Sequence, residues 1–278
     1  MSAQRQFSCR FTPVFGTLLI GAFILLWATH SSGIEQPNAL LPVTVEIPST
    51  LRTTPFDRDR VLMVPPGFKI SVLARVPAAR FIMPLSTGEI LVVQPVLGSI
   101  LLVRPQADGT AAVSTIIEDL QSPQGMALHS SDDKLYLYVG ESNQVSRFLI
   151  APGATSAGDK TVIVPNLPDS SNIELRGPYR HWLKNLVIGP DNKLYVDIAS
   201  STNADPIDTT SNPVRSAIYQ YDLDGSNGKI FARGIRNAEG LAFVPVRMSF
   251  GPRSTKPMTF STRSTTAGKA ADRSTTGN

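Results

Sequence analysis

The chain has 278 residues, 42% hydrophobic and 17% charged, so it is long enough to bury the core of one all-β domain. Its formal net charge of +4 is misleading, because the excess of Lys and Arg lies at the two ends of the chain. Residues 35–245 contain 18 basic and 21 acidic side chains. This slightly acidic balance gives no reason to expect a nucleic acid as a partner.

Residues 1–33 are predicted to be a targeting segment. Arg5 and Arg10 precede an uncharged apolar run at residues 11–28, and small polar residues follow, which is the order of a secretory signal peptide. The run is also long enough for an uncleaved membrane anchor. Both alternatives predict export, with a periplasmic, secreted or membrane-anchored product. Cys9, the only cysteine, lies in this segment, so the rest of the chain has neither disulfides nor cysteine metal sites.

Residues 34–60 are polar with little periodicity and are predicted to form a linker or an extended N-terminal arm. The folded domain is expected to span residues 61–245. It opens with a Pro-Pro-Gly turn at residues 65–67 and an alternating pattern at residues 68–74. This pattern predicts a strand that completes the last blade of a ring.

A unit of two strands joined by a polar turn recurs along the domain. Its copies lie at residues 86–93, 125–139 and 186–198, and a further one starts at residue 240. Each of the first three copies is followed by two more strands, at residues 99–103 and 113–117, 145–149 and 160–164, and 217–221 and 229–231. Four short strands per repeat of roughly 50 residues predict an all-β protein with a β-propeller fold and about four blades. No amphipathic helix separates the strands, which argues against a parallel α/β fold.

Residues 246–278 differ in composition from the repeats. Twelve of these 33 positions are Ser or Thr, and large apolar side chains are scarce. Such a segment buries too little apolar surface to fold alone. It is predicted to be a disordered tail, and the blade that starts at residue 240 is expected to be incomplete.

The residues that can carry chemistry precede the inner strands. In a propeller these approach loops crowd the mouth of the central channel. Of the three histidines, His181 is the best placed, beside Trp182 and just before an inner strand, although a packed structural histidine has the same signature. Gln124 lies in the approach loop of the preceding blade. Arg236 and Asn237 lie in that of the following blade, where a surface arginine and a turn asparagine are the simpler interpretation.

Asp205 and Asp208 lie in an insertion at residues 202–213 and have the oxygen ligands that calcium prefers. A solvated loop is the simpler interpretation, so no metal ligands are assigned. No phosphate-binding glycine loop, serine nucleophile elbow or metal-binding histidine pair is present in the sequence.

Four segments resemble the glucose/sorbosone dehydrogenase family and the similar pyranose dehydrogenases. They are PPGF at residues 65–68, YVGESN at 138–143, GPDNKLYV at 189–196 following His181, and GIRNAEGLAF at 234–243. The resemblance covers residues 64–245. The family's members are exported six-bladed propellers that bind pyrroloquinoline quinone (PQQ) and calcium. Members continue for further blades, which bring the calcium ligands, so this chain is expected to be a C-terminally incomplete copy.

The resemblance implies an oxidoreductase that acts on a sugar or aldehyde and passes electrons to an external acceptor. It implies that His181 is the general base on the substrate hydroxyl while hydride passes to the quinone. Arg236 and Asn237 are implied to hold the quinone, with Gln124 as a further contact on the cofactor side. Two alternatives remain: an inactive, truncated propeller that serves as a binding module, and a calcium-dependent propeller of the lactonase type.

Overall fold

The computed structural model describes residues 40–151, 153–169, 181–243 and 260–263. The predicted targeting segment therefore lies outside the described residues. The described chain is almost entirely β-structure, which confirms the all-β propeller prediction. Besides strands it contains only two short 3₁₀ helices, η1 (Ser49–Leu51) and η2 (Pro206–Thr209).

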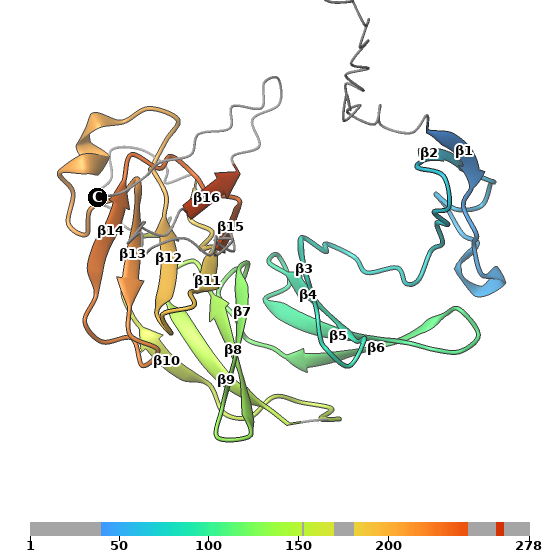
Figure 1. The fold of residues 1–278 in the computed structure, drawn as a ribbon, viewed down its shortest axis with the longest axis horizontal. Helices are drawn as coiled ribbons and strands as arrows, with labels where there is room; N and C mark the ends of the chain where they lie inside the picture. The colour runs from blue at the N-terminus through green and yellow to red at the C-terminus, as the bar shows by residue number, and fades with distance from the viewer. Residues whose placement is uncertain (1–39, 152, 170–180, 244–259, 264–278) are drawn as a thin grey trace, which may run out of the picture.

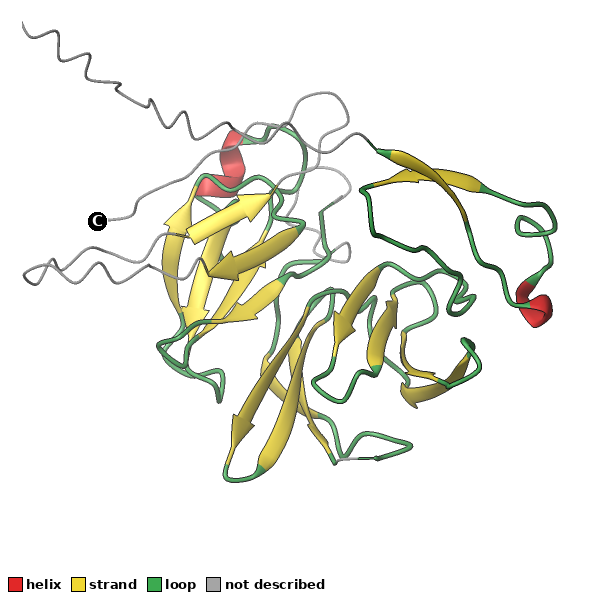
Figure 2. Cartoon of the chain, turned by 45° about the vertical axis from the view of Figure 1, so that its right-hand side comes forward, coloured by secondary structure: helices red, strands yellow, loops and turns green. Residues whose placement is uncertain are grey.

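Three consecutive antiparallel sheets of four strands follow one another along an arc (Figures 1 and 2). We call them blades 1, 2 and 3. Blade 1 contains β3 (Phe81–Pro84), β4 (Ile90–Gln94), β5 (Ser99–Pro105) and β6 (Ala111–Ile117). Blade 2 contains β7 (Met126–Ser131), β8 (Lys134–Gly140), β9 (Val145–Ile150) and β10 (Thr161–Val164). Blade 3 contains β11 (Leu186–Ile188), β12 (Leu194–Ile198), β13 (Ala217–Tyr221) and β14 (Lys229–Arg233). In each blade the strands pair in chain order, as expected of a propeller.

A fourth sheet consists of two strands, β15 (Gly240–Phe243) and β16 (Phe260–Arg263). Strand β16 lies within the segment predicted to be a disordered tail, so that prediction is wrong for residues 260–263. The backbone explains the difference, because the open edge of β15 offers hydrogen bonds to any extended segment whatever its composition. The innermost strands β7, β11 and β15 lie side by side.

The N-terminal part of the described chain forms a hairpin of β1 (Leu41–Thr44) and β2 (Val61–Val64), which stands apart from the blades in Figure 1. The predicted linker therefore contributes one strand. The alternating residues 68–74 form no strand and make one isolated bridge, between Ser71 and Glu46. Leu73, Ala74 and the following Val76 pack against a buried cluster of blade 1, whereas Phe68 is 64% exposed.

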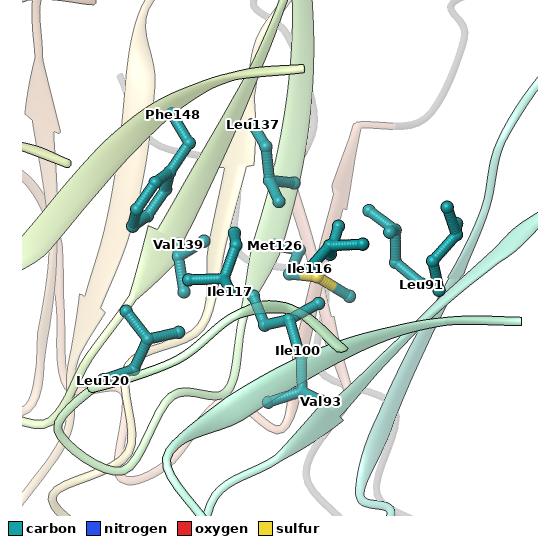
Figure 3. Packing of buried hydrophobic residues seen from close by; sticks show 11 residues of the cluster. Leu91, Val93, Ile100, Ile116, Ile117, Leu120, Met126, Leu137, Val139 and Phe148 are labelled. Atoms are coloured by element: carbon teal, nitrogen blue, oxygen red, sulfur yellow. The ribbon is translucent and has the colours of Figure 1, made fainter. Parts of the chain in front are cut away.

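Blades are held together by strands that are buried on both faces. Leu137 and Val139 of β8 point toward blade 1, whereas Tyr138 between them points toward blade 3. Figure 3 shows the cluster between blades 1 and 2, to which Leu91, Met126 and Phe148 belong. Each fully buried aliphatic side chain of this kind stabilises the fold by about 1.5–3 kcal/mol. This packing fixes neighbouring blades relative to each other and so positions their approach loops.

Candidate functional site

The approach loops of all four sheets are joined by side-chain hydrogen bonds at one end of the molecule. Arg80, before β3, donates from Nε to Oε1 of Gln124, before β7, at 2.7 Å. Gln124 Nε2 donates to Oδ1 of Asn185, before β11, at 3.3 Å. Asn185 Nδ2 donates to the carbonyl oxygen of Ala238, before β15, at 2.6 Å. Polar groups that precede the innermost strands of four repeats therefore meet in one place.

The chain of contacts closes on itself through Glu239. Its Oε1 accepts a hydrogen bond from Asn237 Nδ2 at 2.7 Å, and its Oε2 lies 3.5 Å from Arg80 Nη2. We call Arg80, Gln124, Asn185, Asn237 and Glu239 the four-loop network. Gln124 and Asn185 are 2% exposed, whereas the side chain of Arg80 is 50% exposed. The network thus has buried amide side chains at its inner end and charged side chains at its exposed rim.

Two glycines allow the loops of blades 2 and 3 to approach so closely. A Cβ atom on Gly125 would lie 2.8 Å from the Cα of Asn185, and one on Gly140 would lie 2.4 Å from the carbonyl oxygen of Lys184. The same carbonyl accepts a hydrogen bond from the Gly125 backbone N–H at 3.0 Å. Backbone thus packs on backbone here, which only glycine permits.

His181 is half-buried and is held from one side. Its Nδ1 lies 2.8 Å from the carbonyl oxygen of Ser200 and 3.1 Å from the Ser200 hydroxyl. Because a carbonyl can only accept, Nδ1 carries the proton, and Nε2 is left with its lone pair. Ser200 follows β12, so the turn after a central strand of blade 3 sets the tautomer of the imidazole.

Arg236 reaches the same place through its backbone. Its carbonyl oxygen accepts from the Ser200 backbone N–H at 2.7 Å and from the Ser200 hydroxyl at 2.9 Å. Its guanidinium points away from this contact, and Nη1 donates to Oδ1 of Asn203 at 2.9 Å. His181 and Arg236 are therefore brought together by Ser200, while the charged end of Arg236 stays near the surface.

A buried lysine and a buried aspartate lie below these loops. Lys184 Nζ donates to the carbonyl oxygens of Pro168, at 2.7 Å, and Trp182, at 2.5 Å. Burial lowers the pKa of Lys184 to about 7. Asp197 accepts from the Ala238 backbone N–H at 3.1 Å, and burial raises its pKa to about 7. The second carboxylate oxygen of Asp197 has no hydrogen-bond partner among the described residues.

Two cavities flank the four-loop network. One, of about 310 Å³, lies between the innermost strands of all four sheets and is bordered by Phe81, Met126 and Leu241, with Asn185 also on its wall. The other, of about 340 Å³, lies at the outer side and is bordered by Arg80, Val96, Ser122 and Trp182. The latter has an aromatic wall, Trp182, which adjoins His181 in sequence, and a cationic group, Arg80.

The structure places the four predicted site residues in one region but in two groups. Gln124 and Asn237 belong to the four-loop network, whereas His181 and Arg236 are joined through Ser200. The sequence did not predict the residues around them, which are Arg80, Lys184, Asn185, Asp197 and Ser200. The available signal was position alone, because Arg80 and Asn185 directly precede inner strands as the predicted residues do.

The acidic insertion differs from its simplest interpretation. Asp208 is 1% exposed rather than solvated; it accepts from the Ser201 backbone N–H at 2.9 Å and lies 3.6 Å from Arg215. Asp205 caps η2 through the backbone N–H of Ile207. Within the described residues, no three His, Cys, Asp or Glu side chains gather in a way that would hold a metal ion.

Comparisons with known proteins agree with this architecture. The model of the family described as TrAA12-like matches residues 62–251. The PQQ domain of a pyranose dehydrogenase from Coprinopsis cinerea has a similar fold, with a TM-score of 0.55 and 17% sequence identity over 75% of this chain. The PQQ-bound aldose sugar dehydrogenase from Streptomyces coelicolor has a TM-score of 0.50 and 17% identity over 69% of this chain. The family match confirms the predicted family, and the two solved structures, at 17% identity, show that the fold is shared.

The chain spans 51% of the pyranose dehydrogenase domain and 57% of the aldose sugar dehydrogenase, about half of each. No curated protein matches it in sequence. Among the described residues, no helix has the length and apolar character needed to cross a membrane. Residues 11–28, the predicted signal or anchor, lie outside that range.

Proposed function

The chain belongs to the TrAA12-like family, and we propose that it serves as a PQQ-dependent dehydrogenase that oxidises a sugar or an aldose-like substrate. The single observation that supports this most directly is the contact between His181 Nδ1 and the Ser200 carbonyl. It leaves an unprotonated imidazole nitrogen, held in a fixed orientation, beside the approach loops of four repeats. An alcohol oxidation needs such a group to remove the hydroxyl proton.

His181 is proposed as the general base. Its Nε2 accepts the proton of the substrate hydroxyl, and the positive charge that forms on the ring is stabilised by the Ser200 carbonyl at Nδ1. When bound, PQQ supplies the acceptor for the hydride that leaves the carbon atom bearing this hydroxyl. The Ser200 hydroxyl, which also contacts the Arg236 and Thr202 carbonyls, keeps the turn behind His181 in place.

The residues around the mouth suit a cofactor that carries several carboxylates. Arg236 has one planar cationic group near the surface, and Arg80 at the rim has another, half-exposed one. A guanidinium binds a carboxylate with two parallel hydrogen bonds. Asn237 is proposed to contact the quinone as well. Gln124, buried with both polar atoms engaged, is proposed to act by holding Arg80 rather than by direct contact.

Three further properties are proposed. Calcium dependence and an external electron acceptor follow from the family resemblance, and export to the periplasm or the medium, with or without a membrane anchor, follows from residues 1–33. The distinguishing experiment is a titration of the full chain with PQQ and calcium, followed by the absorbance change of the quinone when aldoses are added. We expect saturable binding and sugar-dependent reduction. His181→Ala should abolish the reduction and retain PQQ binding.

His129→Ala is the matched control, because His129 lies in the middle of β7 and away from the approach loops. It should behave like the native chain. Reduction that proceeds unchanged in His181→Ala would refute the general-base role. A folded chain that binds no PQQ would refute the proposal as a whole and favour the binding-module alternative.

A further inference from the structure

A third cavity lies between blades 1 and 2, at the end of the blades opposite the approach loops. Its volume is about 330 Å³, within the range of small-molecule sites. The residues that line it come from the ends of strands where the chain turns away from the candidate site, such as Leu85 of the β3–β4 turn and Leu135 at the start of β8. The cavity is therefore separate from the four-loop network and from His181.

The walls of this cavity are mostly hydrocarbon. Leu91, Leu102 and Ile116 of blade 1 face Leu128 and Ile150 of blade 2 across it. Three of these residues, Leu91, Leu102 and Ile116, belong to the cluster of Figure 3, so the cavity is a continuation of the contact between blades. At this end of the blades the apolar side chains no longer fill the contact between blades 1 and 2. The space that remains is bordered by leucine and isoleucine side chains.

A loop between β9 and β10 forms the outer wall and is fastened to both blades. The Ala157 backbone N–H donates to the Ile116 carbonyl at 3.0 Å, and the Gly158 N–H donates to the Leu149 carbonyl at 2.8 Å. Arg104 Nη2 donates to the Ala154 carbonyl at 2.8 Å. The wall is thus part of the fold, fixed at three points, rather than a loop that happens to lie nearby.

One charged pair lines the cavity. Arg104 donates from Nε to Oε1 of Glu89, and this hydrogen bond is the main cause that lowers the pKa of the Glu89 carboxyl. Both groups are therefore ionised at neutral pH and compensate each other. Thr87 donates to the other oxygen of Glu89 at 3.0 Å. An anionic ligand would have to displace Glu89 from Arg104, whereas an uncharged one would not.

From these observations we propose that the cavity between blades 1 and 2 is a second ligand site, which binds an uncharged, largely hydrocarbon small molecule with one polar end. The body of the ligand packs on the leucines and isoleucines. Its hydroxyl or carbonyl group meets the hydroxyls that border the cavity, Ser86, Ser130 and Ser156. This proposal does not depend on the proposed oxidoreductase activity.

The test uses N-phenyl-1-naphthylamine, an uncharged aromatic probe that fluoresces in apolar surroundings, with the full chain. We expect saturable binding at one site per chain. Ala151→Trp fills the rim of the cavity from an exposed position and should weaken binding by about tenfold or more. Ala112→Trp is the matched control, because Ala112 is exposed on β6 and does not line the cavity. Equal binding in both variants would overturn the proposal, since it would place the probe elsewhere, for example on the exposed β1–β2 hairpin.

A competition experiment tests the charge of the ligand. Decanol should displace the probe from the native chain, and decanoate at the same concentration should not. Glu89→Gln frees Arg104 from its carboxylate partner, so decanoate should then compete. Displacement by decanoate from the native chain as efficient as that by decanol would contradict the uncharged ligand class.

Discussion

Lys184, in the approach loop of blade 3, and Asp197, on β12, are both fully buried, and burial moves their pKa values from opposite sides to about 7. Desolvation disfavours the charged form of each, and their mutual attraction only partly offsets it. Asp169, Arg215 and Glu239 also contribute to the local potential. The base of the candidate site is therefore sensitive to pH in the neutral range.

The first prediction concerns this pH dependence. Between pH 3.8 and about 7 the folded chain binds the Asp197 proton more tightly than the unfolded chain, so this contribution to stability falls as the pH rises. Between about pH 7 and 10.5 the unfolded chain binds the Lys184 proton more tightly, so this contribution grows as the pH rises. Asp197→Asn should reduce the slope of the unfolding free energy against pH between pH 3.8 and about 7. Lys184→Met should reduce this slope between about pH 7 and 10.5.

Urea unfolding across a pH series measures both effects. Each limb has a slope of at most about 1.4 kcal/mol per pH unit, the limit for one proton. If either variant kept the slope of the native chain in its own range, the titration of that residue would not be the cause.

A second prediction tests the close approach of blades 2 and 3. Gly140→Ala places a Cβ 2.4 Å from the Lys184 carbonyl oxygen, so a strand or a loop must move. We expect a loss of about 1–3 kcal/mol in the free energy of unfolding. Gly240→Ala is the control, because a Cβ there meets nothing within 4 Å. Two variants with equal stability would show that the approach is not tight.

A third prediction addresses the four-loop network. Gln124→Leu keeps the size of a buried side chain but leaves Arg80 Nε and Asn185 Oδ1 without their partner. The expected cost is about 1–3 kcal/mol of stability. Gln121→Leu, three residues earlier and exposed, should cost nothing measurable. Thermal unfolding of both variants would show whether the two positions differ.

A fourth prediction concerns the proposed cofactor contact. Arg236→Ala removes a guanidinium whose Nη1 is held by Asn203, and should weaken PQQ binding by about 1.5–3 kcal/mol, the range for a charged hydrogen bond. Arg233→Ala, at the end of β14 in the same segment, should bind PQQ as the native chain does. Isothermal titration with PQQ compares them, and equal affinity would remove Arg236 from the proposed site.

Strands of the blades were predictable because their signals are local. The strand at 217–221 was predicted with the bounds that the structure has, and the two-strand unit predicted at 186–198 starts with β11 and ends with β12, since these segments are short, mostly apolar runs bordered by turn residues. Residues 68–74 show the limit of this reasoning. Their alternation is real, but no strand forms: Ser71 makes one isolated bridge, and Leu73 and Ala74 pack on blade 1.

The sequence indicated which loops supply the candidate site residues, but not all of the residues that hold them in position. Position before an inner strand identified Gln124, His181, Arg236 and Asn237 as neighbours of one mouth. It did not identify Ser200, which joins two of them, because a serine after a strand has no distinctive sequence signal. Asp197 was not identified either, because the sequence does not show whether an aspartate within an apolar strand is buried.

The contacts of the four-loop network also determine when the mouth forms during folding. They join residues 44, 61 and 53 positions apart, whereas the connections between paired strands within a blade are shorter, the longest being residues 199–216. Closing longer loops costs more chain entropy, and non-local contacts form late in folding. The mouth therefore assembles after the blades it connects, so removing a member of the network should speed unfolding and leave the refolding rate nearly unchanged.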